Sequence, residues 1–355
     1  MMETIDTQRL QREIEDITER YRAAGYFPSA CVRVFNRKET LAVACVGDAK
    51  EDSLFDAASL TKIATTLQIL RLISGGALAL DEEILDALPP LRDDAFLCKR
   101  LSGVTLRRML THTSSLPAWY PFYILKERDF ISGLSYALAH TEGTVGMVYS
   151  DLNFMLLGKV LEQVRKKPLA RCLQEDLAQP LGLGNMTYLP DPSLPIVPSC
   201  YGNPIEENMC KERGLAFSSF RPAEKPVRGD VNDGNAHYYF DGVSGHAGIF
   251  AAAAAWERLC QFCMNSDDPL IQEAQREQPG APGRGLGFQT GTSYPHGCGH
   301  TGFTGTGIYF STEYDVGVVS LTNRLFYPKE NPNATWEFRR ALHEAVFALA
   351  GVFTK

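Results

Sequence analysis

The sequence predicts an α+β fold in which an antiparallel sheet, built from both ends of the chain, is flanked by the first and last helices. Two observations support this prediction. Stretches rich in β-branched residues occur at 31–46 and again at 307–322. Residues 80–240 instead show short segments separated by proline and glycine, a pattern typical of short helices. Strands and helices that are segregated along the chain indicate an α+β arrangement with an inserted, mostly helical region.

The first eighty residues predict a helix, a hairpin and a second helix. Apolar residues with helical spacing predict the first helix over residues 6–22. Strands at 31–35 and 40–46 are joined by a polar turn at 36–39. After Ser59 a second apolar stripe begins, and it ends at a Gly-Gly pair of the kind that closes helices. The residues of this stripe are Leu60, Ile63, Leu67, Leu70 and Ile73.

The second half of the chain predicts a loop, two helices and another hairpin. Residues 190–226 are rich in proline, serine and asparagine and predict a loop, whereas 251–264 predict a helix. The later elements are a hairpin of strands 307–311 and 316–322 joined at 312–315, and a final helix from Trp336 to Ala350. We therefore expect a discontinuous α/β domain (1–80 and 240–355), an inserted helical domain (81–239), and an active site in the cleft between them.

Composition and charge narrow the classes of partner. The 355 residues include 45% apolar and 22% charged residues, close to globular averages, and the net charge is −7 without a lysine or arginine stripe. We therefore expect a small-molecule substrate, no nucleic acid and no membrane partner. The N-terminus lacks the apolar core of a signal peptide, and no run approaches the ~20 apolar residues of a membrane span. A cytoplasmic protein is the expectation.

The nine cysteines are scattered and odd in number, which favours reduced thiols over a disulfide framework. Cys260 and Cys263 form a C-x-x-C, but no second pair or histidine cluster completes a zinc site. We expect buried, inert thiols there, and neither a metal nor a cofactor.

Ser59 and Lys62 are the first candidates for chemistry. They lie three residues apart at the start of an apolar helix, so their side chains share one face. A serine hydroxyl becomes a useful nucleophile when a base takes its proton, and a lysine can do so if burial keeps it neutral. The alternative is a helix N-cap beside a surface lysine. The stretch alone does not decide between them.

Two later stretches bear on that choice: Y-S-D-L-N at 149–153 and G-H-T-G-F-T-G-T at 299–306. Ser-x-x-Lys, Tyr-x-Asp and His-Thr-Gly, in this order, resemble the three motifs of the serine β-lactamase and penicillin-binding-protein superfamily. The middle motif is similar to that of its class C β-lactamase, D-Ala-D-Ala carboxypeptidase and esterase branch. Supporting stretches are M-L-T-H-T-S-S-L-P (109–117), G-V-S-G-H-A-G-I-F (242–250) and V-N-D-G-N-A (231–236), the last similar to an element of muropeptide-hydrolase relatives.

The resemblance spans roughly residues 29–325 and implies a role for each matching residue. Ser59 corresponds to the acyl-forming nucleophile, Lys62 to its partner, and Tyr149 to the phenol or phenolate that relays protons. Asp151 is implied to contact Lys62 or the substrate amide. The resemblance implies that His300, Thr301 and Gly302 line the strand-edge side of the site. It also implies that the oxyanion meets the backbone N–H groups of Ser59 and Phe303.

The sequence departs from the family pattern at three positions. His300 replaces a lysine and removes a permanent positive charge, although a histidine supplies charge when protonated or otherwise a hydrogen bond. Asn232 replaces the histidine of a Val-His-Asp element, which puts the role of that histidine in doubt. Asp151 replaces the usual asparagine and favours a charged Lys62, so whether Lys62 or Tyr149 is the main base stays open.

Other candidates have two readings each. His112 is expected to order its loop, and His246 lines the pocket or belongs to a tight turn. Trp119 and Tyr120 belong to an aromatic cluster that is either core or a substrate wall. The predicted function is a serine hydrolase without cofactor that acts on a peptide, muropeptide or ester. The alternatives are a non-catalytic sensor that binds β-lactams or muropeptides, and a class C-like β-lactamase.

Overall fold

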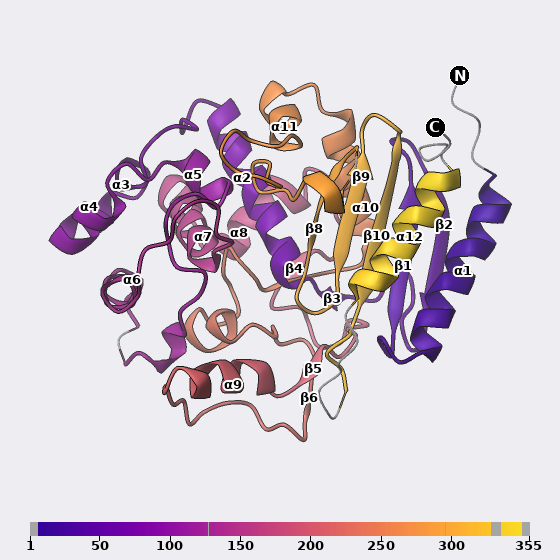
Figure 1. Cartoon of the computed structure of the whole chain (residues 1–355), viewed down its shortest axis with the longest axis horizontal. Coiled ribbons are helices and arrows are strands. Elements are labelled where there is room, and N and C mark those ends of the chain that lie inside the picture. The colour runs from indigo at the N-terminus through magenta and orange to yellow at the C-terminus, as the bar shows by residue number, and fades with distance from the viewer. Residues whose placement is uncertain (1–5, 127, 295, 328–334, 350–355) are drawn as a thin grey trace.

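A five-stranded antiparallel sheet is the largest element of the fold. The computed structural model describes residues 6–126, 128–294, 296–327 and 335–349, and it confirms the predicted α+β class (Figure 1). The strand order is β2-β1-β10-β9-β8, so the N-terminal hairpin joins the C-terminal strands through the pair β1–β10. In that order the strands are Thr40–Val46, Ala30–Phe35, Val316–Thr322, Gly307–Ser311 and Cys298–Thr301.

Helices cover both faces of this sheet. Helices α1 (Thr7–Ala23) and α12 (Trp336–Leu349) pack on one face and α10 (Ala253–Asn265) on the other. Strand β10 explains why both faces are covered, because its apolar side chains point alternately to each side. Val316 and Val318 belong to the core under α1 and α12, whereas Val319 and Leu321 belong to the larger core on the opposite side.

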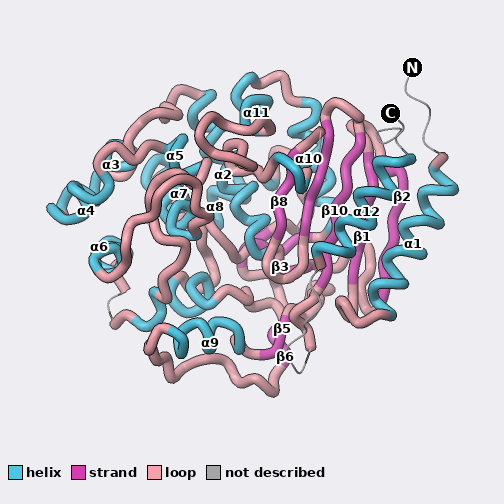
Figure 2. Tube along the Cα trace, in the orientation of Figure 1, coloured by secondary structure: helices cyan, strands magenta, loops and turns pink. Residues whose placement is uncertain are grey.

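The helical half of the molecule is organised around α2 (Thr61–Ser74). Figure 2 shows the strands of the large sheet in one half and most of the short helices in the other. Every residue of α2 from Thr61 to Leu70 is buried, which makes it a central helix; it packs on α7 (Asp151–Arg165). The remaining helices are α3 (Ile84–Ala87), α4 (Ala95–Leu101), α5 (Leu106–Leu110), α6 (Phe130–Ala139), α8 (Leu169–Leu173), α9 (Pro204–Glu212) and α11 (Pro269–Ala274).

Two small sheets connect the halves. The first has the order β3-β7-β4, with strands Phe55–Asp56, Ile249–Ala251 and Thr187–Tyr188. The second pairs β5 (Cys200–Tyr201) with β6 (Pro226–Val227). Strand β3 leads directly to Ser59, so the first small sheet fixes the backbone that enters α2.

The structure corrects several predicted element boundaries. The predicted loop 190–226 contains α9, because a proline in the first turn of a helix starts rather than interrupts it. Ala251 pairs with Phe55 as a strand residue, so pairing overrides the helical preference of the alanine run, and α10 begins at Ala253. Helix α2 begins at Thr61, after a 3₁₀ turn at Ala58–Leu60. Ala350 lies outside the described residues.

Within the described ranges, no helix combines the length and hydrophobicity needed to cross a membrane. The division into domains at residues 80 and 240, and the cytoplasmic location, stay predictions.

Candidate active site

A strained turn presents Ser59 at the N-terminus of α2. Ala58, the preceding residue, has a φ of 47°, in the left-handed region that side chains other than glycine rarely adopt. The carboxylate of Asp56 holds this turn, because its Oδ1 accepts the Ala58 N–H at 2.9 Å. Its Oδ2 accepts the Asn232 N–H at 2.6 Å. Burial raises the pKa of Asp56 to about 6, although the two N–H donors act in the opposite direction.

The His-Thr-Gly stretch is bonded to the same turn. Thr304 Oγ1 donates to the Asp56 carbonyl at 2.7 Å, and Thr306 Oγ1 donates to the Ala57 carbonyl at 2.9 Å. Gly302 lies against this backbone, since a Cβ there would be 2.6 Å from the Ala57 oxygen. Only glycine therefore permits the approach of the β8 end to the Ser59 turn.

Lys62 is the buried polar centre of the site. Its ammonium Nζ lies 3.1 Å from Ser59 Oγ and 3.0 Å from the His246 carbonyl oxygen. It also forms an ion pair of 2.8 Å with Asp151 Oδ1, and the lysine side chain has no exposed surface. Burial acts to lower the pKa of Lys62, but the charges of Asp151 and Tyr149 together raise it above its ordinary value. Lys62 is therefore an ammonium that donates to Ser59 in the resting site.

Tyr149 lies between two cations. The Lys62 ammonium is 5.0 Å from the centroid of its ring, and the Arg284 guanidinium is 5.1 Å from it. The rings of His112 and His300 are 4.6 and 6.0 Å away. Both cations therefore lie within cation–π range of the Tyr149 ring.

The two histidines beside Tyr149 are neutral and carry opposite tautomers. His112 Nδ1 accepts the Ser150 N–H at 3.1 Å, so its proton is on Nε2. His300 Nδ1 lies 2.8 Å from the Thr301 carbonyl, so its proton is on Nδ1. Burial, followed by the charges of Arg284 and Lys62, holds the pKa of both rings well below the ordinary value. His300 therefore supplies no positive charge, and His112 orders its loop as its sequence suggests.

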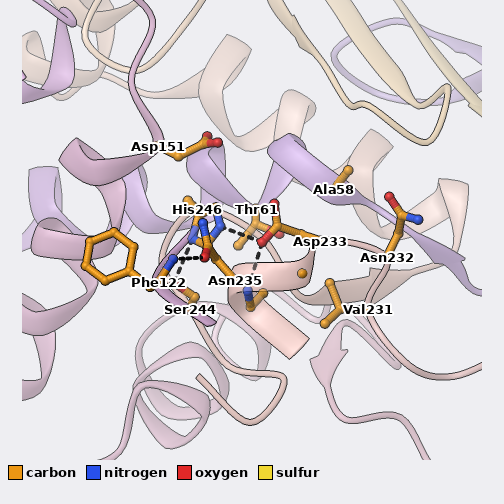
Figure 3. Close-up of polar contacts among 12 residues, drawn as sticks. Ala58, Thr61, Phe122, Asp151, Val231, Asn232, Asp233, Asn235, Ser244 and His246 are labelled. Atoms are coloured by element: carbon orange, nitrogen blue, oxygen red, sulfur yellow. Dashed lines mark hydrogen bonds and ion pairs between the residues drawn. The ribbon is translucent and has the colours of Figure 1, made fainter. Parts of the chain in front are cut away.

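Asp151, the ion-pair partner of Lys62, forms a cluster with Asp233 and His246 (Figure 3). Their ligand atoms lie within 4.8 Å of one another, a spacing that could hold a metal ion. His246 Nε2 is 2.9 Å from Asp233 Oδ1, and its Nδ1 is 2.7 Å from Ser244 Oγ. Lys62 already supplies a cation beside Asp151, and its Nζ also donates to the His246 carbonyl, so Asp151 and the His246 backbone hold the lysine in place.

Asn232 lies apart from this cluster. Figure 3 shows its side chain directed away from His246. Its Nδ2 lies 2.9 Å from Cys200 Sγ, and its backbone carbonyl accepts the Asn203 amide at 2.8 Å. The departure from the Val-His-Asp element therefore changes the surroundings of Cys200 and leaves Ser59 and Lys62 untouched.

The pocket beside Ser59 has a volume of about 420 Å³ and contains part of the predicted set. Tyr149, Thr301, Gly302 and Phe303 line it with Ser59, whereas Asp151 and His300 lie behind it. His246, Trp119 and Tyr120 do not line it. Tyr120 is buried against Phe122, whereas Trp119 is half-buried and packs on Tyr123 and under the Arg213 guanidinium, so these aromatic residues pack in or against the core and not along this pocket.

The pocket also has residues that the sequence did not single out: Gln289, Thr335, Trp336, Arg284, Arg324 and Arg339. No acidic side chain is among the described residues that line it. A cavity of about 1050 Å³ adjoins it and shares Arg284 and Arg339. Arg284 Nη1 is buried and has no hydrogen-bond partner within the described part of the chain. Arg284 stands in an irregular Pro- and Gly-rich loop, where no periodicity or motif marks a side chain as functional.

The chain is similar to known proteins along most of its length. A family model described as Beta-lactamase matches residues 14–342. The N-acetylmuramyl-L-alanine amidase of Bacillus subtilis (strain 168) is 29% identical over 372 residues, covering 91% of this chain and 83% of that protein.

Two solved structures share the fold. EstCE1, described as a hydrolase with promiscuous acyltransferase activity, has a TM-score of 0.71 at 19% identity and covers 96% of this chain and 99% of its own. The beta-lactamase/D-alanine carboxypeptidase of Yersinia pestis has a TM-score of 0.69 at 18% identity, with coverage of 97% and 99%.

Proposed function

Since the chain belongs to the Beta-lactamase family, we propose that it is a serine hydrolase that cleaves an amide or ester bond through an acyl-enzyme on Ser59. One observation carries the proposal: the buried Lys62 ammonium contacts Ser59 Oγ at 3.1 Å, and Ser59 lines the pocket together with Tyr149. Burying an ammonium group disfavours its charged form. A buried lysine without a function beside the pocket would therefore lower the stability of the fold.

We assign the first proton transfer to Tyr149. Lys62 holds its own proton in the resting site, so it serves as a cation beside the nucleophile. As Ser59 Oγ bonds to the substrate carbonyl carbon, its proton passes to a Tyr149 phenolate, and the oxyanion meets the N–H groups of Ser59 and Phe303. Tyr149 then returns the proton to the leaving amine or alcohol as the scissile bond breaks. A water molecule then attacks the acyl carbon and gives its proton to Tyr149. Tyr149 passes this proton to Ser59 Oγ as the acyl bond breaks, and the carboxylic acid product leaves.

The arginines of the pocket support an anionic substrate. Arg284, Arg324 and Arg339 line it without an acidic neighbour among the described lining residues. Carboxylates are the natural partners of guanidinium groups. We therefore propose an amide substrate with a carboxylate on its leaving group, as in peptidoglycan-fragment peptides. The relative from Bacillus subtilis is named an N-acetylmuramyl-L-alanine amidase. Its name supports the bond between an N-acetylmuramyl group and L-alanine as the candidate scissile bond of this chain.

The test compares the protein with its Ser59→Ala variant. We expect a mass adduct on Ser59 after exposure to penicillin or a fluorophosphonate, and its loss in the variant while the circular dichroism spectrum is unchanged. Hydrolysis is then measured for muramyl-L-alanine peptides, D-Ala-D-Ala peptides, nitrocefin and nitrophenyl esters. Full esterase activity in Ser59→Ala would refute the mechanism. An adduct without turnover of any substrate would instead identify a sensor, and rapid nitrocefin hydrolysis a β-lactamase.

A further inference from the structure

Two cysteines face each other across the N-terminal hairpin. Cys31 of β1 and Cys45 of β2 are direct partners in the antiparallel register, so their side chains point to the same face of the sheet. Both are free thiols, and their sulfur atoms lie 3.0 Å apart. The Cα atoms of such opposed residues lie about 4.5–5.5 Å apart, within the range of about 4.4–6.8 Å that a disulfide spans. The backbone is therefore already placed for a covalent link.

The pair joins an accessible thiol to a protected one. Cys45 is half-buried on β2, an edge strand of the large sheet, whereas Cys31 is fully buried in the core on the α10 side of the sheet. An oxidant that arrives from solvent therefore reaches Cys45 first. The buried sulfur of Cys31 then lies in contact with the oxidised sulfur, which is the arrangement of an attacking thiol beside a resolving thiol.

The surroundings of the two sulfurs favour the thiolate of Cys45. The hydrogen bond with Cys31 holds the pKa of Cys45 below its ordinary value, although burial and the charges of Glu51 and Asp52 act in the opposite direction. The charge of Arg33, two residues along β1, also acts to lower it. The same hydrogen bond, followed by burial, raises the pKa of Cys31. Cys45 is therefore the nucleophile of the pair, because the thiolate is the reactive form.

We propose that Cys31 and Cys45 form an intrachain disulfide when the protein meets a hydroperoxide, with Cys45 as the attacking thiol and Cys31 as the resolving thiol. The disulfide links the two strands at the end of the hairpin opposite its turn, and it closes the loop of residues 31–45. The inference does not rest on the proposed function, since neither cysteine lines the Ser59 pocket.

The reaction is a two-electron oxidation in two steps. The Cys45 thiolate attacks one oxygen of hydrogen peroxide, the O–O bond breaks, and Cys45 becomes a sulfenic acid. The hydroxide that leaves takes up the proton that the Cys45 thiol had released to solvent. Cys31 then attacks the Cys45 sulfur, the S–S bond forms and the S–O bond breaks, and the departing hydroxide takes the Cys31 proton. Two thiols are oxidised, and one peroxide is reduced to two waters.

The test is peptide mapping of the whole chain before and after treatment with hydrogen peroxide. Trypsin cleaves after arginine and lysine, so Cys31 falls in peptide 23–33 and Cys45 in peptide 39–50. We expect these two peptides to become linked, the number of thiols titrated in denaturant to fall by two, and dithiothreitol to reverse both changes. Cys98→Ser, which removes the other half-buried cysteine, is the matched control and is expected to form the same link.

Two variants test the order of the steps. In Cys31→Ala we expect the oxidation of Cys45 to stop at the sulfenic acid, which dimedone traps as a mass adduct; in Cys45→Ser we expect no adduct on the buried Cys31. Circular dichroism checks that both variants are folded. A thiol count that peroxide leaves unchanged, a sulfinic acid at Cys45 of the unsubstituted protein, or a link from Cys45 to any other cysteine overturns the proposed disulfide. A dimedone adduct on Cys31 in Cys45→Ser overturns the assigned order.

Discussion

At the scale of single residues, the site is governed by the charge on Lys62. A buried lysine is expected to lose its proton, but the carboxylate of Asp151 at 2.8 Å keeps Lys62 charged. In the mechanism that we propose, this charge makes Lys62 a cation beside Ser59 and leaves the proton transfers to Tyr149.

The first prediction concerns Tyr149. In Tyr149→Phe we expect kcat for a nitrophenyl ester to fall by ~10²-fold or more, the usual contribution of a general acid or base. Stopped-flow acylation measures this step directly. Tyr120→Phe, at a buried tyrosine outside the pocket, is the control and is expected to leave the rate unchanged. If Tyr149→Phe acylates at the wild-type rate, Lys62 is the base.

The second prediction concerns Asp151. Replacing it with asparagine removes the charge that holds the Lys62 proton, so the pKa of Lys62 falls and its ammonium is lost at lower pH. We expect the alkaline limb of the kcat/KM profile to move down by about one pH unit or more. Asp86→Asn, which removes an exposed carboxylate paired with Arg92, is expected to leave the profile in place. No shift in Asp151→Asn would show that Lys62 does not need its charge.

At the scale of elements, the site depends on three segments that meet at Ser59. Strand β3 and the turn at Ala58 deliver the nucleophile, α7 delivers Asp151 in its first turn, and the end of β8 delivers Thr301. Hydrogen bonds from the Thr304 and Thr306 hydroxyls to the backbone carbonyls before Ser59 connect the segment after β8 to the Ser59 turn. A shift of any one segment therefore changes the distances around Lys62.

The third prediction tests how α7 ends. Lys166, the residue after its last turn, has a φ of 53° and an exposed side chain. Glycine adopts this left-handed conformation without the steric cost that a side chain pays. We expect Lys166→Gly to raise the free energy of unfolding by roughly 0.5–1 kcal/mol in urea denaturation. Lys166→Ala keeps a Cβ and is expected to give no gain; an equal gain from both would trace the effect to the lysine charge.

At the scale of the whole molecule, a negatively charged protein contains a cationic pocket. The chain has a net charge of −7, yet three arginines converge beside Ser59 without an acidic neighbour among the described lining residues. This local excess of positive charge favours the anionic substrate that we propose.

The fourth prediction concerns the pH dependence of stability. The pKa of Glu206 is raised from 4.5 to about 8, so the folded state holds a proton that the unfolded chain releases. Stability from this group is complete at low pH and is lost as the pH rises through about 8. Asp56, with a raised pKa of about 6, also lowers the stability as the pH rises towards 6. His112 and His300, with lowered pKa values, instead reduce the stability as the pH falls below the ordinary histidine pKa. Above these pH values the change in stability comes mainly from Glu206.

We therefore expect the free energy of unfolding to fall between about pH 7 and pH 8.5, by at most about 1.4 kcal/mol per pH unit. Denaturant titrations at several pH values measure it. Glu206→Gln, which keeps the shape and cannot ionise, is expected to flatten the slope. Glu207→Gln, on the same helix and paired with Lys211, is expected to preserve it. A slope unchanged by Glu206→Gln would contradict the raised pKa.

Local patterns predicted the fold class well. Side-chain periodicity is a property of residues that are close together along the chain. It predicts the apolar stripes of α1 and α2 and the two hairpins. The errors occurred where a long-range partner overrides local preference. Ala251, for example, is a strand residue because Phe55 pairs with it.

The sequence by itself determined the family, the α+β class and the order of the three motifs, because these are properties of short stretches. Only the tertiary structure decided the electrostatics of the site. The pairing of Lys62 with Asp151, the neutral His300 and the position of Arg284 over the Tyr149 ring depend on burial and on charges brought from distant segments. Coulomb energy depends on distance through space and on exclusion of water, and neither can be read from separation along the chain.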